Sequence, residues 1–178
     1  MKKWIAAAVA VVVIVGGIYL GSPYYAMHSL RTAALEADTD KLEARVDFPA
    51  VRESLKSQMS AAIMAKMQSD PEMRDNPFAA LGALMIPAMI DRMIDSFVTP
   101  DGIAALVRGQ KPTEKEKVEQ NPDIESTSAY VNLDRFRVRL HNKKLDEEGP
   151  SFLLERRGFA SWKLIKLEMP ADLFEDKK

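Results

Sequence analysis

The chain of 178 residues contains no cysteine and only two histidines, His28 and His141. Without cysteine it cannot form a disulfide, a thiolate metal site, a thiol nucleophile or a lipoprotein anchor. Neither sign of charge predominates, because 25 Lys and Arg residues balance 26 Asp and Glu residues. Such a chain has no overall attraction for a phosphate backbone, so we expect no nucleic-acid partner.

Motifs that carry known chemistry are also missing. The sequence contains no phosphate-binding loop, zinc-protease motif or nucleophile elbow. The clustered carboxylates Asp38, Asp40 and Asp47 are the candidates for acid–base chemistry, but each also suits a helix cap or turn. A catalytic pair needs burial or mutual repulsion to separate its pKa values. We therefore keep an acidic turn as a candidate site, and expect no catalytic residue, metal or cofactor.

A hydrophobic segment lies at the N-terminus. Lys2 and Lys3 precede the uncharged run Trp4–Leu20, which as a helix rises about 1.5 Å per residue and reaches roughly 25 Å. We predict a single-pass signal anchor over residues 1–21, with the basic end in the cytoplasm and the rest of the chain in the periplasm. The alternative is a cleaved signal peptide and a secreted domain. The run is longer than the usual h-region, and no clear cleavage site precedes Pro23.

The remaining pattern predicts one α+β domain over residues 22–170 and a flexible tail over 171–178. Helical spacing, caps and prolines indicate four to five helices, and alternating or β-rich runs indicate an antiparallel sheet of three to four strands. We expect helices at residues 22–37, 39–46, 48–68, 78–97 and 100–107, and strands at 130–140, 151–156 and 162–169. Helices first and strands last favour helices packed on one face of the sheet.

An uncharged stretch from Pro77 to Ile90 is the most apolar part of this domain. It is too short for a second membrane span. One interpretation is a groove for a lipid tail or peptide, lined by Phe78, Leu81, Met85, Met89, Met93 and Phe97. The favoured interpretation is a buried core helix in which methionine fills space. Copper binding is disfavoured, because no cysteine or nearby histidine accompanies the thioethers.

Three arginines alternate with apolar residues in the first expected strand. Arg135, Arg137 and Arg139 should share one face and could meet anionic headgroups or an acidic partner. We favour a solvated face balanced by Asp134, Glu155 and Glu168.

Three segments carry a family resemblance: SPYYAMHSLRTAALEADTDKLEARVDFPAVRESLK, VTPDG and FLLERRGFASWKLIKLEMP. Together, from Ser22 to Pro170, they resemble the bacterial domain-of-unknown-function 2939 family, most specifically at Asp47-Phe48-Pro49 with Arg52. The resemblance implies a membrane-anchored or exported protein without assigned activity, and it supplies no catalytic residues.

A looser similarity is to the NTF2-like α+β fold. A first helix, the acidic turn and the Gly-x-x-x-Trp-Lys sequence beginning at Gly158 carry it, and it implies an apolar pocket. We therefore expect a membrane-anchored, non-enzymatic domain that binds an envelope protein or lipid. The alternative is an NTF2-like small-ligand carrier or enzyme, which an enclosed pocket reaching the acidic turn would favour.

Overall fold

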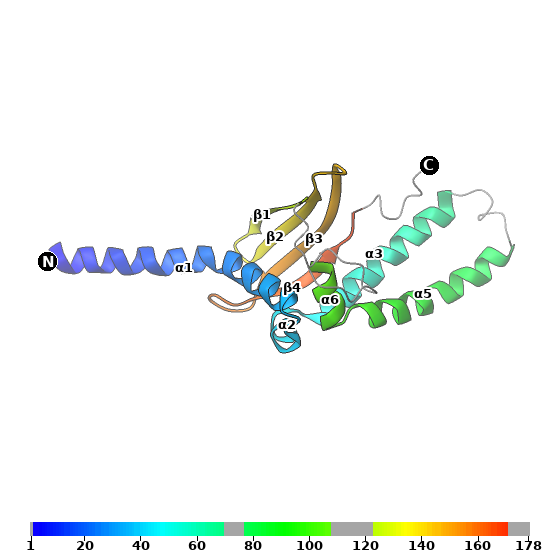
Figure 1. Cartoon of the computed structure of the whole chain (residues 1–178), viewed down its shortest axis with the longest axis horizontal. Helices are drawn as coiled ribbons and strands as arrows, with labels where there is room; N and C mark the ends of the chain where they lie inside the picture. The colour runs from blue at the N-terminus through cyan, green and yellow to red at the C-terminus, as the bar shows by residue number, and fades with distance from the viewer. Residues whose placement is uncertain (1, 70–76, 108–122, 171–178) are drawn as a thin grey trace.

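The computed structural model describes residues 2–69, 77–107 and 123–170, with side chains except at 77–83, 106 and 107. Within these residues the chain has the expected α+β architecture, in which helices precede a four-stranded antiparallel sheet of order β1-β2-β3-β4 (Figure 1). The elements are α1 Lys2–Leu35, α2 Thr39–Arg45, α3 Phe48–Ser69, α5 Pro77–Phe97, α6 Pro100–Val107, β1 Ile124–Asn132, β2 Arg135–Asn142, β3 Glu147–Arg156 and β4 Trp162–Glu168.

Helix α1 joins the hydrophobic segment to the domain without a break. Its first half is apolar, exposed and long enough to cross a membrane. From Ser22 onward one face is buried, with Ala26, Leu30 and Ala34 at 2% exposure or less. The expected anchor and the helix expected at 22–37 form one continuous helix, so the proposed boundary after residue 21 falls inside it. The tail at 171–178 lies outside the described residues.

The inner face of the sheet carries the core. Phe136 and Val138 of β2 pair with Leu154 and Phe152 of β3, and all four are buried together with Trp162 of β4. Helix α3 lies beside β4, where the Gln58 side chain donates to the carbonyl of Leu167 at 2.8 Å and accepts from the backbone N–H of Met169 at 3.1 Å. These bonds occupy backbone groups at the edge of the sheet.

One expected strand is in fact two. Residues 130–140 contain the turn between β1 and β2, where the side chain of Asn132 accepts from the backbone N–H of Asp134 at 3.0 Å. An Asx turn of this kind reverses the chain within a run that otherwise alternates like one strand. The strands expected at 151–156 and 162–169 are confirmed as parts of β3 and β4, which pair as an antiparallel hairpin.

Candidate functional site

Helices α3 and α5, which we call the helical arm, project from the sheet away from the N-terminus (Figure 1). The buried side of α5 carries Ile90 and Ile94 at 4% and 5% exposure. Lys56 of α3 forms ion pairs of 3.3 Å with both Asp91 and Asp95 of α5. Partial burial of the Lys56 amine opposes its charge, but the hydrogen bonds to the two carboxylates outweigh it and raise the Lys56 pKa. The polar side of α5 is thus fixed to α3.

Arginine 52 of α3 fixes the base of the arm. Its guanidinium donates twice to the backbone carbonyl of Val98, at 3.2 and 3.0 Å, just after α5 ends. The chain then turns into α6, where Thr99 accepts from the N–H of Gly102 at 3.1 Å. A Cβ at Gly102 would collide with the carbonyl oxygen of Phe97, so this tight entry requires glycine.

The other face of α5 carries an apolar stripe of Met85, Met89, Met93 and Phe97, which are 68%, 67%, 39% and 44% exposed. The prediction that these methionines fill the core is therefore wrong. The physical reason is that α3 covers only one side of α5, and the described residues place no other element over the stripe. The remaining predicted groove residues, Phe78 and Leu81, belong to α5 but lie outside the described side chains.

Each of the three aspartates of the predicted acidic turn lies at the start of a helix. Asp38 caps α2 by accepting from the N–H of Lys41 at 3.0 Å, and the Lys41 ammonium, hydrogen-bonded at 2.8 Å, holds the Asp38 pKa below its ordinary value. Asp40 lies exposed in the first turn of α2. Asp47 caps α3 through the N–H of Ala50 at 3.2 Å. The three carboxylates therefore act at helix starts.

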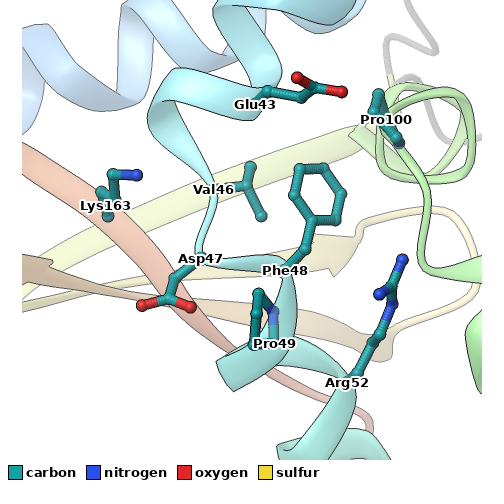
Figure 2. A pocket seen from close by; sticks show the side chains of 8 residues that line it. All are labelled: Glu43, Val46, Asp47, Phe48, Pro49, Arg52, Pro100 and Lys163. Carbon is teal, nitrogen blue, oxygen red and sulfur yellow. The ribbon is translucent and has the colours of Figure 1, made fainter.

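A hollow of about 450 Å³ lies beside Asp47 (Figure 2). It is lined by Glu43, Val46, Asp47, Phe48, Pro49, Arg52, Pro100 and Lys163. The hollow is open to solvent, and two of its charged groups are already engaged, Asp47 with Arg157 at 3.1 Å and Arg52 with Val98. It lacks the enclosure that an NTF2-like ligand pocket would need.

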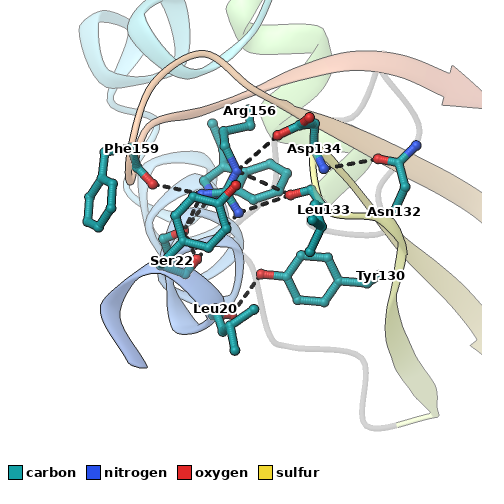
Figure 3. A network of polar contacts seen from close by, with 10 residues as sticks. Leu20, Ser22, Tyr130, Asn132, Leu133, Asp134, Arg156 and Phe159 are labelled. Atoms are coloured by element: carbon teal, nitrogen blue, oxygen red, sulfur yellow. Dashed lines mark hydrogen bonds and ion pairs between the residues drawn. The ribbon is translucent and has the colours of Figure 1, made fainter. Parts of the chain in front are cut away.

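A dense polar network joins α1 to the sheet (Figure 3). The guanidinium of Arg156, whose side chain is 6% exposed, lies between two aromatic rings, 3.7 Å from the Tyr19 centroid and 4.3 Å from that of Trp162. Trp162 donates to the Ser22 hydroxyl at 2.8 Å, and Tyr130 donates to the carbonyl of Leu20 at 2.8 Å. We call these six residues, Tyr19, Leu20, Ser22, Tyr130, Arg156 and Trp162, the anchor clasp.

Proline 23 explains why the clasp lies at this turn of α1. A proline has no N–H, so the carbonyl of Tyr19, four residues earlier, loses its helical donor. The Ser22 hydroxyl at 2.8 Å and the Arg156 guanidinium at 3.4 Å donate to that carbonyl instead. The strand pattern alone did not indicate this role of Arg156; a proline inside a long helix is the signal that an outside donor is needed.

On the outer face of the sheet, the predicted balance of charge is confirmed for Glu155 and Glu168, whereas Asp134 pairs with Arg156. Arg135 pairs with Glu155 at 3.8 Å, and Arg137 pairs with Glu168 at 3.5 Å. Lys166 approaches Glu168 to 2.9 Å. This face is a mixed network in which two carboxylates offset most of the charge of three cations.

A family model described as "Protein of unknown function (DUF2939)" matches residues 12–106, just over half of the chain. The chain belongs to this family. The match spans most of α1 and the helical half, including Arg52 and the described part of the arm, whereas the sheet with Arg156 and Trp162 lies beyond it. No curated protein and no solved structure matches this family member, and none of the comparisons supports the similarity to NTF2-like proteins.

Proposed function

We propose that this chain is a membrane-anchored interaction protein of the bacterial envelope. Helix α1 stays in the inner membrane with its N-terminus in the cytoplasm, and the periplasmic helical arm binds an apolar helix of an envelope protein. The observation that carries the proposal is the apolar stripe on α5, which remains exposed although the opposite side of that helix is firmly held.

Retention of α1 is supported by the anchor clasp. Signal peptidases cleave an accessible segment near the end of the apolar run, but here that segment is helical and Ser22 and Pro23 are buried. The bonds of the clasp reach back to the carbonyls of Tyr19 and Leu20. Cleavage after Gly21 would remove these partners and leave the Arg156 guanidinium without one of its two stacking rings.

Binding of a helix by the arm is supported by the chemistry of the stripe. Methionine is unbranched and polarisable, so a methionine-rich face adapts to partners of varied shape. Residues spaced by four along one helix present a continuous ridge, which suits an apolar ridge of a second helix. A soluble domain seldom leaves such a ridge uncovered unless it has a partner.

The position of the arm favours a protein over the anchoring bilayer. Helix α1 leaves the domain at one end, while the arm projects at the opposite end (Figure 1). A rigid α1 therefore holds the stripe away from the membrane in which it is anchored. The open hollow beside Asp47 and the filled interior around Phe136 and Trp162 favour this binding role over that of a small-ligand carrier.

Photocrosslinking in intact cells tests the binding surface of the arm, and the mass of the intact protein tests the retention of α1. Full-length protein carrying benzoylphenylalanine at Met89 should give one defined protein adduct, and the adduct should disappear when Met85→Gln and Met93→Gln are added. The same crosslinker at Leu145, which is 60% exposed in the turn between β2 and β3, is the matched control. Equal adducts at both positions would reject the arm as the binding surface. An intact mass beginning near Ser22 would reject the retained anchor.

A further inference from the structure

Two turns of the sheet lie beside α1 at the level where its apolar run ends. They are the β1–β2 turn, residues 133–134, and the β3–β4 turn, residues 157–161, and both face the N-terminal part of α1 (Figures 1 and 3). The ring of Phe159 lies 5.5 Å from that of Tyr19, and Tyr130, at the end of β1, is bonded to Leu20. The opposite turn, between β2 and β3, is at the far end of the same strands.

A single guanidinium fixes both turns. Arg156 donates to the carbonyl of Phe159 at 2.7 Å and to the carbonyl of Leu133 at 3.0 and 3.2 Å, while it also reaches Tyr19. The turns are therefore held against α1 through their backbones. Two apolar side chains of these turns remain exposed to solvent, Leu133 at 63% and Phe159 at 54%.

These exposed apolar side chains lie at a defined depth. Tyr19 and Leu20 close the hydrophobic run of α1, and a tyrosine at that point is typical of the headgroup region of a bilayer. Groups that contact α1 at Tyr19 and Leu20 must lie at the same level. Phe159 contacts Tyr19 directly, and Leu133 is linked to the same level through Arg156, which donates to the Leu133 carbonyl and stacks on the Tyr19 ring. The two side chains therefore extend the apolar surface of the span sideways into the domain.

We infer that Leu133 and Phe159 insert into the periplasmic surface of the same bilayer, so that the domain sits directly on the lipid instead of swinging on a tether. The occupant is the lipid surface because the two side chains are continuous with the span itself. The inference rests on the proposed retention of α1. Its consequence is that three contacts, one helix and two turns, set the direction in which the arm points.

Single-cysteine labelling tests the inference, because the native chain has no cysteine. Full-length Leu133→Cys and Phe159→Cys carry the environment-sensitive dye NBD in vesicles of phosphatidylethanolamine and phosphatidylglycerol. Leu145→Cys, similarly exposed at the opposite turn, is the matched control, and Ile14→Cys reports the span. All three turn positions are exposed, so the core is unchanged.

The expected result is a blue-shifted emission and at least about twofold stronger quenching by headgroup-region nitroxide lipids at residues 133 and 159 than at 145. Residue 14 should be quenched by nitroxides placed deep in the acyl chains. If the dyes at residues 133 and 159 are quenched no more than the dye at 145 while the dye at 14 is quenched, Leu133 and Phe159 do not insert into the bilayer, but α1 is retained in it. If the dye at 14 is not quenched either, both the retention of α1 and the insertion of the two turns are contradicted.

Discussion

The clasped end of the molecule and the helical arm differ in which of their side chains are buried and which are exposed. At the clasped end, the buried guanidinium of Arg156 is stacked between two rings and hydrogen-bonded to backbone carbonyls. In the arm, the polar contacts of Lys56 and Arg52 face inward between α3 and α5, while methionine faces water. Both ends use polar groups to join elements, but the arm also presents a whole apolar stripe of one helix without a described partner.

This difference separates the part of the chain that maintains the fold from the part available for binding. Core residues from α1, α2, α3, α6 and all described strands except β1 form the buried cluster, and α5 contributes only its inner face. Removing an outward methionine from α5 therefore exposes no core. The contrast predicts large losses of stability at the clasp and nearly none at the stripe.

Trp162→Ala should give the largest loss. The indole is 1% exposed, stacks on Arg156 and donates to Ser22, so truncation leaves a cavity and removes a buried hydrogen bond. We expect the free energy of unfolding to fall by about 3–5 kcal/mol, measured by urea denaturation of the full chain in detergent micelles. Trp162→Phe, which keeps most of the volume, should recover part of it. A loss below about 1 kcal/mol would show that the clasp does not maintain the fold.

Arg156→Met should give the next largest loss. Methionine keeps the stem but removes the donors to Leu133, Phe159 and Tyr19, whose carbonyls then lack these bonds. We expect a loss of about 2–3 kcal/mol in the same denaturation measurement. Arg156→Lys should restore less than half, because an ammonium cannot span the same acceptors or stack as a plane. The control Arg139→Met, on an exposed strand position, should change stability by under about 0.5 kcal/mol.

The helical half could be predicted from sequence because its signals are local. Asp38 and Asp47 cap the helices that they precede, and Pro100 opens α6 as expected. Such signals act within one turn of helix, so they do not depend on what the rest of the chain does.

The remaining features depend on partners that are distant in sequence. Strand β1 is mostly polar and exposed on both faces, so only its pairing with β2 defines it. The apolar residues of α5 show that the helix is apolar, but not which of its sides another element covers. The prediction places Met89 in the core, whereas the core lies on the opposite side of the helix, at Ile90 and Ile94. The clasp joins Ser22 to Trp162 across the whole domain, and no local pattern encodes that contact.

Glu168→Gln tests the charge network on the outer face of the sheet, where we expect a smaller effect. Partial burial opposes ionisation of Glu168, but hydrogen bonds from Lys166 and Ser151, both 2.9 Å, lower its pKa below the ordinary 4.5. Because the pKa of Glu168 is lower in the folded than in the unfolded protein, its ionised form stabilises the fold at pH values above the unfolded pKa. This contribution is lost as the pH falls through the folded-state pKa. The variant should lose under about 1 kcal/mol near neutral pH. Denaturation curves of the two proteins should converge below pH 4.5, and a constant difference would contradict the assignment.

The triple change Met85→Gln, Met89→Gln and Met93→Gln should have the smallest effect on stability. Glutamine matches methionine in length and helix propensity, and the three side chains are exposed. We expect the free energy of unfolding to change by under about 0.5 kcal/mol, whereas Met85→Gln and Met93→Gln should abolish the crosslink of the protein that carries benzoylphenylalanine at position 89. Ile90→Gln, one residue along the same helix but 4% exposed, is the matched control and should cost several times more. If the triple variant instead unfolds like the Ile90 variant, the stripe belongs to the core, and the contrast between the two ends fails.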